Sequence, residues 1–144
     1  MQKPMSMEKI YSKIETDKVL HIIHRIEQAK DVPRNDLIGS NNFIQCSFLK
    51  LKKDSTFKPH KHIFKKREYE NQIAQESWVV IKGSVKCIFY DIDDSIIAER
   101  VLRQGDASFT LLGGHNYVSL EDDTIVYEYK TGPYEGQEYD KTFI

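Results

Sequence analysis

Three histidines and one glutamate stand in segments of this chain that otherwise resemble β-strands. His60 and His62 are separated by a single residue, Glu76 opens a run that ends at Gly83, and His115 follows a pair of glycines. On a strand, residues i and i+2 point to the same face, so the imidazoles of His60 and His62 could meet one ion. Imidazole and carboxylate groups are common ligands of divalent transition metals. The residue types and their spacing therefore indicate a metal site.

The elements that would position these side chains are strands. From residue 43 onward, short runs rich in Val, Ile, Phe and Tyr alternate with turn residues such as Gly83 and Gly105. The runs predict strands near 43–51, 56–62, 76–82, 85–91, 96–103, 107–112, 115–120 and 124–130. Many short strands joined by tight hairpins favour a closed or sandwiched antiparallel barrel, because closure removes exposed strand edges. We therefore expect an all-β domain over 41–144.

Residues 1–40 are expected to form a short α/β extension before this domain. The apolar residues of 19–26 fit a short helix or a strand, and their periodicity does not decide between the two. His21 and His24 lie in this stretch, and we expect them to have packing or surface roles. Because segment 7–26 has more apolar residues than a lone barrel needs, we expect it at or near the interface of a homodimer.

Segment 63–75 interrupts the strand pattern. It is polar, it shows no apolar alternation, and it lies between His62 and Glu76. A loop of this length in a small β-domain is often functional. We expect it to form a lid or a rim at the mouth of the site.

Composition narrows the class of protein. The chain has 144 residues, of which 40% are hydrophobic, which suits one domain with a single core. Its 21 basic and 22 acidic residues give a net charge of −1, without the clustered basic surface that nucleic-acid binding needs. The polar start of the chain and the lack of a run of about 20 apolar residues predict a cytoplasmic protein without a membrane span. Cys46 and Cys87 are expected to be buried thiols.

Residues 56–83 resemble the first sequence motif of the cupin superfamily, G-x5-H-x-H-x3-4-E-x6-G. His60 and His62 match the histidine pair, and six residues separate Glu76 from Gly83. The chain departs from the motif in two places: Asp54 replaces the first glycine, and 13 residues separate His62 from Glu76, as a loop insertion would produce. The second motif, G-x5-P-x-G-x2-H-x3-N, is matched more loosely, by Gly105, Gly113 and His115 with Leu111 at the usual proline.

The C-terminal part of the chain resembles one particular group within the cupin superfamily. Residues 127–134 and the pair Asp140-Lys141 are similar to the closing E-x-K-x-G-P-Y and D-K signature of small WbuC-type cupin fold metalloproteins. The similarity covers roughly residues 30–143. It implies a single-domain double-stranded β-helix, or jelly-roll barrel. It also implies one divalent metal (Fe, Mn, Ni, Co or Zn) bound by four ligands, His60, His62, Glu76 and His115.

The function that the resemblance implies is isomerase- or epimerase-type chemistry on a sugar or nucleotide sugar in surface polysaccharide biosynthesis. Such a step needs a proton shuttle, for which the candidates are Tyr90, Tyr127 and Tyr129. Glu128 and Lys130 lie on the opposite face of the last strand, and the sequence does not say which face is inside. Two alternatives remain open: an Fe(II)-dependent dioxygenase acting on a small molecule, and a non-catalytic saccharide-binding or regulatory cupin. The four-ligand set argues against metal-free chemistry with a His base and a Tyr acid, since such a site does not need it.

Overall fold

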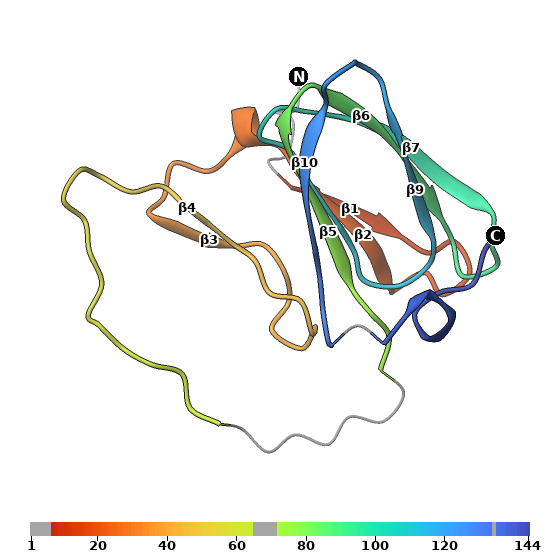
Figure 1. The fold of residues 1–144 in the computed structure, drawn as a ribbon, viewed down its shortest axis with the longest axis horizontal. Coiled ribbons are helices and arrows are strands. Elements are labelled where there is room, and N and C mark those ends of the chain that lie inside the picture. Colours follow the sequence, from red (N-terminus) through yellow and green to blue (C-terminus); the bar gives the residue numbers. More distant parts are fainter. Residues whose placement is uncertain (1–6, 65–71, 134) are drawn as a thin grey trace.

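Two antiparallel sheets face each other in the computed structural model, which describes residues 7–64, 72–133 and 135–144 (Figure 1). The larger sheet has the strand order β1-β2-β8-β5-β10 and the smaller has the order β7-β6-β9. The strands of the larger sheet are β1 (Met7–Tyr11), β2 (Val19–His24), β8 (Ala107–Thr110), β5 (Glu76–Lys82) and β10 (Ile125–Lys130). Those of the smaller sheet are β6 (Ser84–Tyr90), β7 (Ile96–Arg103) and β9 (His115–Ser119).

The main core lies between the two sheets, since strands of both contribute to it. Each sheet turns alternate residues inward, as the pleat requires, and these inner residues are mostly aliphatic or aromatic. The larger sheet contributes Ile10, Ile23 and Val80, and the smaller contributes Val85, Cys87, Phe89, Ala98 and Leu102. Burial of this apolar surface is the main term that holds the two sheets together.

A second core covers the other face of the larger sheet. The short pair β3 (Arg34–Asp36) and β4 (Ser47–Leu49) forms a separate two-stranded sheet. The chain around it packs Leu37, Ile38 and Ile44 against Ile22 and Phe109. Both faces of the central strands β2 and β8 are therefore buried, which explains why β8 is buried at every position.

Most predicted strands between residues 76 and 130 are confirmed, with ends shifted by a few residues. Segment 19–26, for which helix and strand were both open, contains the strand β2. It pairs with β8 near the centre of the larger sheet, so residues 7–24 belong to the sandwich rather than to a separate extension. Their apolar side chains Ile10, Leu20, Ile22 and Ile23 are buried within the chain itself. The surplus of apolar residues therefore gives no reason to place a dimer interface there.

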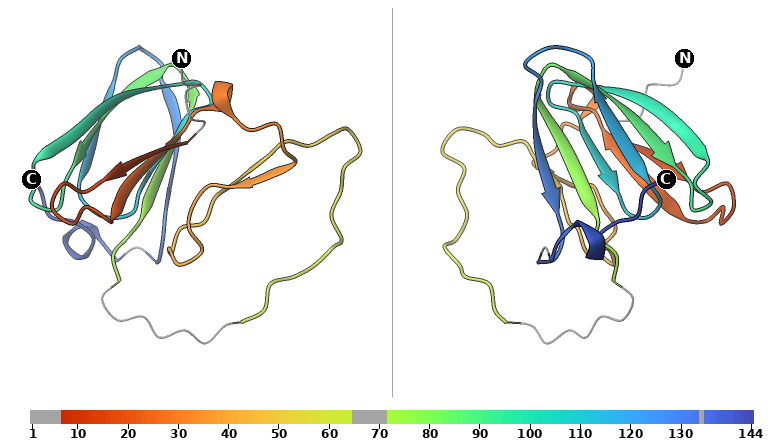
Figure 2. Two further views of the ribbon diagram at one scale, coloured as in Figure 1. Left: turned by 180° about the vertical axis from the view of Figure 1, so that it is seen from behind. Right: turned by 45° about the vertical axis from the view of Figure 1, so that its right-hand side comes forward.

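The strand predicted at 56–62 is wrong, and the strand predicted at 43–51 is reduced to β4. Residues 50–64 follow an irregular path that extends away from both sheets in every view (Figures 1 and 2). This segment contains Pro59, which cannot donate a ladder hydrogen bond, and five lysines (Lys50, Lys52, Lys53, Lys58 and Lys61). Its apolar side chains are exposed (Leu51, Phe57, Ile63 and Phe64). Without a strand there, the described residues form no closed barrel, although the all-β class is confirmed.

Helices are a minor part of the described chain. They are the 3-10 turns η1 (Ile26–Gln28) and η2 (Gln137–Tyr139). No helix among the described residues is long and apolar enough to cross a membrane.

Candidate functional site

A row of polar side chains crosses the inner face of the larger sheet at one end of the sandwich. The register pairs His21 of β2 with Thr110 of β8, Thr110 with Glu76 of β5, and Glu76 with Lys130 of β10. Residues that are paired in register on neighbouring strands lie side by side on one face. This face is the inner one, since Ile23 and Val80, at even spacing from His21 and Glu76, belong to the main core.

His115 meets this row from the opposite sheet. It begins β9, and its Nδ1 lies 2.8 Å from the hydroxyl oxygen of Thr110. Its Nε2 lies 3.4 Å from Oε1 of Glu76. Their side chains are only 23% and 14% exposed, so both groups are largely shielded from water but not sealed from it. Two of the four predicted metal ligands are thus neighbours.

The turn before His115 needs glycine for its backbone. Gly113 has a φ of 84°, a conformation that side chains disfavour. A Cβ at this position would also lie 2.5 Å from the carbonyl oxygen of Tyr90. The positive φ at Gly113 allows the chain to turn tightly and deliver the imidazole of His115 to the site.

Aromatic residues form the floor below Glu76 and His115. The rings of Trp78 and Tyr117 stack with centroids 4.0 Å apart and planes 5° from parallel. The Trp78 indole N–H donates to Oε1 of Glu76 at 3.2 Å, and the Tyr117 hydroxyl lies 2.8 Å from that of Ser108. The floor therefore holds the Glu76 carboxylate in position and separates the polar row from the main core.

Burial and a neighbouring carboxylate change the ionisation of Glu76. Burial raises the pKa of the Glu76 carboxyl to about 7, and hydrogen bonding and repulsion from Glu128 add to that effect. The positive charge of Lys130 opposes it. The Glu76 carboxyl therefore holds a proton for part of the time near neutral pH, which an exposed glutamate does not do.

The pKa of His115 is lowered, whereas that of Glu76 is raised. Burial lowers the pKa of its imidazole to about 4, and the positive charges of Lys141 and Lys130 contribute to the shift. The ring is therefore neutral at physiological pH, with one nitrogen bare. A neutral imidazole can bind a metal or accept a proton, whereas a charged one can do neither.

The C-terminal tail lies beside this end of the sandwich. The Lys130 ammonium is 3.5 Å from a carboxylate oxygen of Asp140. The side chain of Ile144 reaches the glycine turn, where a Cβ on Gly114 would lie 2.4 Å from it. Both the D-K pair and the last residue of the chain thus lie close to the candidate site.

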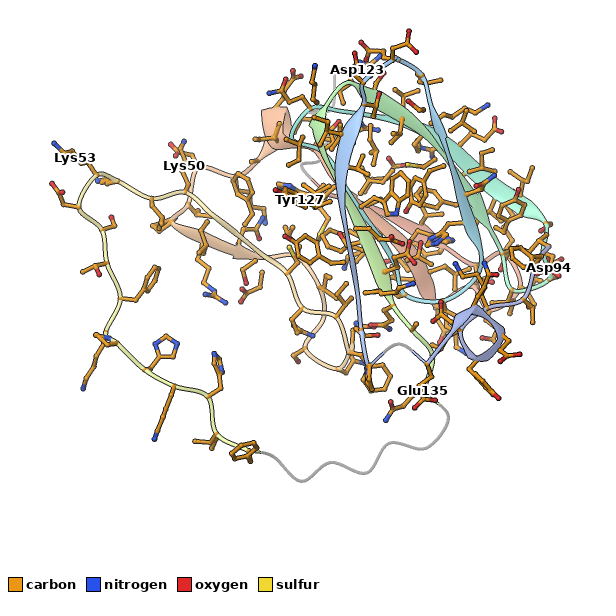
Figure 3. The ribbon with its side chains drawn as sticks, in the orientation of Figure 1. Lys50, Lys53, Asp94, Asp123, Tyr127 and Glu135 are labelled. Carbon is orange, nitrogen blue, oxygen red and sulfur yellow. The ribbon has the colours of Figure 1, made fainter. Side chains whose placement is uncertain are left out.

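His60 and His62 lie elsewhere. Both are exposed on the irregular segment 50–64, with ring centroids 5.5 Å apart, and Nδ1 of His60 is 2.9 Å from the carbonyl oxygen of Lys58. Figure 3 shows that this segment leaves the fold after Lys50, which directly follows β4, and that Lys53 already lies well away from the two large sheets. Within the described part of the chain, no group of three or more His, Cys, Asp or Glu side chains could hold a metal. The predicted four-ligand set is therefore not assembled.

The tyrosines proposed as proton shuttles also lie outside the site. Tyr127 and Tyr129 are about 60% exposed, at 58% and 59%, and they pair with Val79 and Ser77 on the outer face of the larger sheet. Figure 3 shows Tyr127 on the side of β10 that faces away from β9. The alternation instead turns Glu128 and Lys130 inward. Tyr90 ends β6 and contributes its backbone carbonyl, which lies 3.1 Å from Nε2 of His21.

The sequence analysis did not identify His21, Thr110 or Tyr117 as members of this site. One signal was present: in the predicted strand 107–112, Ser108 and Thr110 alternate with Phe109 and Leu111. This pattern marks a strand with one polar face, although it does not show which face is inside. The loop 63–75, expected as a lid or rim, falls largely outside the described residues.

A cavity of about 290 Å³ lies on the other face of the larger sheet, lined in part by Ile22, Leu37 and Leu111. It is separate from Glu76 and His115, which lie on the inner face. No protein-family model, curated protein or solved structure matches this chain. The chemistry of the site therefore rests on its own residues and their geometry.

Proposed function

We propose that the end of the sandwich around Glu76 and His115 binds a divalent transition metal and acts on a small polar molecule. A sugar or nucleotide sugar is the class that the cupin resemblance favours. The observation that carries the proposal is the 3.4 Å approach of a carboxylate oxygen of Glu76 to the bare nitrogen of a neutral His115. The two donors come from opposite sheets and meet at a partly exposed position, where a ligand can enter.

The donor set fits a transition metal. Two ligands with bonds of about 2.1 Å to one ion lie about 3 Å apart when they are adjacent in its coordination sphere. Nδ1 of His115 is engaged by Thr110, which directs Nε2 towards Glu76, and metal-bound histidines commonly make such a second hydrogen bond. His60 and His62 would complete the set by resemblance, and this requires segment 50–64 to approach the end of the sandwich.

A bound metal would polarise a carbonyl or hydroxyl oxygen of the substrate. The protein's own groups then determine how protons move and how the substrate is held. Glu128 adjoins Glu76 on the inner face of β10, in place of the outward-facing Tyr127 and Tyr129, so it is suited to transfer a proton at this end of the sheet. Lys130 supplies a positive charge that can orient an anionic group, such as the phosphate of a nucleotide sugar.

A metal-free acid–base site is the second candidate. A carboxyl group with a pKa of about 7 beside a neutral imidazole can deliver and accept a proton near neutral pH. In this version His115 acts as the base and Glu76 or Glu128 as the acid, so the same residues serve a reaction that needs no ion.

The metal content of the purified protein distinguishes the metal site from the metal-free acid–base site. The protein is purified, reconstituted separately with Fe, Mn, Ni, Co and Zn, and measured by elemental analysis beside the variants Glu76→Gln, His115→Gln and His60→Ala/His62→Ala. Tyr127→Phe is the matched control, since it changes an exposed side chain on the outer face of β10. We expect about one ion per chain in the parent protein and the control, and loss of the ion in Glu76→Gln and His115→Gln.

The double histidine variant tests the ligand set. Loss of the metal in His60→Ala/His62→Ala would support four ligands, and its retention would limit the site to the sandwich. If the reconstituted parent protein binds no metal, the metal proposal fails and the acid–base site remains.

Turnover is tested on the metal-loaded protein with a panel of keto sugars and nucleotide sugars in D₂O. Isomerase or epimerase chemistry should incorporate deuterium at the carbon that loses a proton, which NMR detects. Oxygen consumption with the Fe(II) form would instead support a dioxygenase. Saturable binding without exchange or oxygen uptake would support a saccharide-binding protein.

A further inference from the structure

A chain of hydrogen bonds runs through the buried end of the sandwich, and its direction can be deduced. It starts at the backbone carbonyl of Tyr90, which can only accept a hydrogen bond. Nε2 of His21 lies 3.1 Å from this oxygen. That nitrogen must therefore carry the proton, because a bare nitrogen would leave two acceptors facing each other in a buried place.

Nδ1, the other ring nitrogen of His21, must accept a hydrogen bond. This side chain is fully buried, and burial lowers the pKa of its imidazole to about 4, so the ring is neutral and holds one proton. Since Nε2 has that proton, Nδ1 is an acceptor. Among the described residues, the hydrogen-bond partner of Nδ1 is the Thr110 hydroxyl at 3.0 Å, which therefore donates to it.

The Thr110 hydroxyl determines which nitrogen of His115 carries the proton. A hydroxyl has one hydrogen, and that of Thr110 is already donated to His21. At its 2.8 Å contact with Nδ1 of His115, the Thr110 oxygen must then accept, so Nδ1 of His115 carries the proton. With Nδ1 engaged in this way, Nε2 is the nitrogen of His115 that is left to receive a cation or a proton, and it faces Oε1 of Glu76 at 3.4 Å.

We infer that His21 and Thr110 are positioning residues that keep a proton on Nδ1 of His115 and aim its Nε2 at Glu76. The opposite direction would place a bare Nε2 of His21 against the Tyr90 carbonyl, with no donor between them. The arrangement leaves an imidazole nitrogen and a carboxylate as two acceptors that share one position, which a cation or a proton fills. The effect on metal affinity rests on the proposed function, whereas the state of the two rings does not.

The first test observes the two histidine rings in the parent protein. The metal-free full chain is labelled with ¹⁵N-histidine, and long-range ¹H–¹⁵N NMR at pH 7.5 reports which nitrogen of each ring is protonated. His21→Gln and His115→Gln assign the two rings. We expect opposite forms in one protein, with the proton on Nε2 in His21 and on Nδ1 in His115. A proton on Nε2 of His115 would overturn the inference.

Thr110 is then tested by a matched pair of variants. Thr110→Val removes the hydroxyl at nearly constant shape, and Thr110→Ser keeps it. We expect Thr110→Val to shift His115 towards the Nε2–H form and to weaken metal binding by about 10- to 100-fold, as loss of an outer hydrogen bond to a metal-bound histidine does. Thr110→Ser should retain the Nδ1–H form and the affinity.

The outcomes separate the two proposals. An unchanged His115 ring in Thr110→Val would overturn the positioning role even if the protein binds metal. A parent protein that binds no metal would overturn the proposed metal function, and the ring states of His21 and His115 would still decide whether the hydrogen-bond chain exists.

Discussion

Trp78 and Tyr117 join the two sheets directly beneath the candidate site. Trp78 belongs to β5 of the larger sheet and Tyr117 to β9 of the smaller, and their rings stack with centroids 4.0 Å apart. The Tyr117 hydroxyl also lies 2.8 Å from that of Ser108, on the neighbouring strand of the larger sheet. The relative position of Glu76 and His115, one from each sheet, therefore depends on this contact.

Two substitutions should distinguish the ring stacking of Tyr117 from its hydrogen bond. Tyr117→Leu removes the stacked ring and leaves a cavity, so we expect the free energy of unfolding to fall by about 3 kcal/mol. Tyr117→Phe keeps the ring and loses one hydrogen bond, which should cost about 1 kcal/mol. Urea denaturation followed by tryptophan fluorescence measures both. Equal losses in the two variants would show that the ring contact adds nothing to the hydrogen bond.

Acid should destabilise the fold through His21. Burial lowers its pKa to about 4 in the folded protein, from the ordinary histidine value of 6.5, so between these pH values the unfolded chain binds more protons than the folded one. The stability is therefore fully present above pH 6.5 and falls as the pH drops towards 4. A shift of this size corresponds to on the order of 3 kcal/mol, because each pH unit of displacement is worth about 1.4 kcal/mol.

The loss of stability between pH 6.5 and pH 4, here called the acid limb, should become smaller when His21 is replaced. His21→Gln retains hydrogen-bonding groups but has no titrating ring, so its unfolding free energy should change less between pH 6.5 and pH 4. The matched control is His60→Gln, whose ring is exposed on segment 50–64 and should leave the limb unchanged. Denaturant titrations at several pH values provide the measurement. Parallel limbs in the parent protein and His21→Gln would contradict the assignment.

The strands between residues 76 and 130 could be predicted because their apolar alternation and their turns agree. Gly83 and Gly105 have positive φ and mark the turns after β5 and β7, as the sequence indicated. Segment 56–62 was predicted to be a strand because of its histidine spacing, although its lysines and Pro59 provide no face to bury. The position of β2 could not be predicted, because pairing with a distant strand such as β8 leaves no local signal.

The candidate site could likewise be predicted only in part. Glu76 and His115 were identified from residue type and motif, and their approach depends on how the two sheets pack against each other. Tyr127 and Glu128 could not be told apart, since a one-residue change of register exchanges the two faces of a strand. Thr110 escaped notice because a threonine in a strand has no chemical signature until its neighbours are known.

Ser12 is predicted to stabilise the turn between β1 and β2. Its buried hydroxyl donates to Oδ1 of Asp91 at 2.6 Å and accepts from the backbone N–H groups of Ile14 and Glu15, both at 3.0 Å. Ser12→Ala removes the acceptor of the two N–H groups and one of the donors to Oδ1 of Asp91, which keeps the Ile92 N–H at 2.8 Å. We therefore expect the free energy of unfolding to fall by about 2 kcal/mol. Ser55→Ala, on the exposed segment 50–64, is the control and should stay within about 0.5 kcal/mol. A small effect of Ser12→Ala would indicate that water replaces the hydroxyl.

The two cysteines should differ in reactivity towards a thiol reagent such as Ellman's reagent. Cys87 is fully buried in the main core, and burial raises the pKa of its thiol to about 12, so the reactive thiolate is scarce and inaccessible. Cys46 is only partly buried, and burial raises its pKa as well. We therefore expect one slow reaction in the native protein, at Cys46, and a second only when the sandwich opens. Cys46→Ser isolates this second reaction, whose rate should rise with urea in parallel with the unfolded fraction. Fast, urea-independent labelling of Cys46→Ser would show that Cys87 is not enclosed between the sheets.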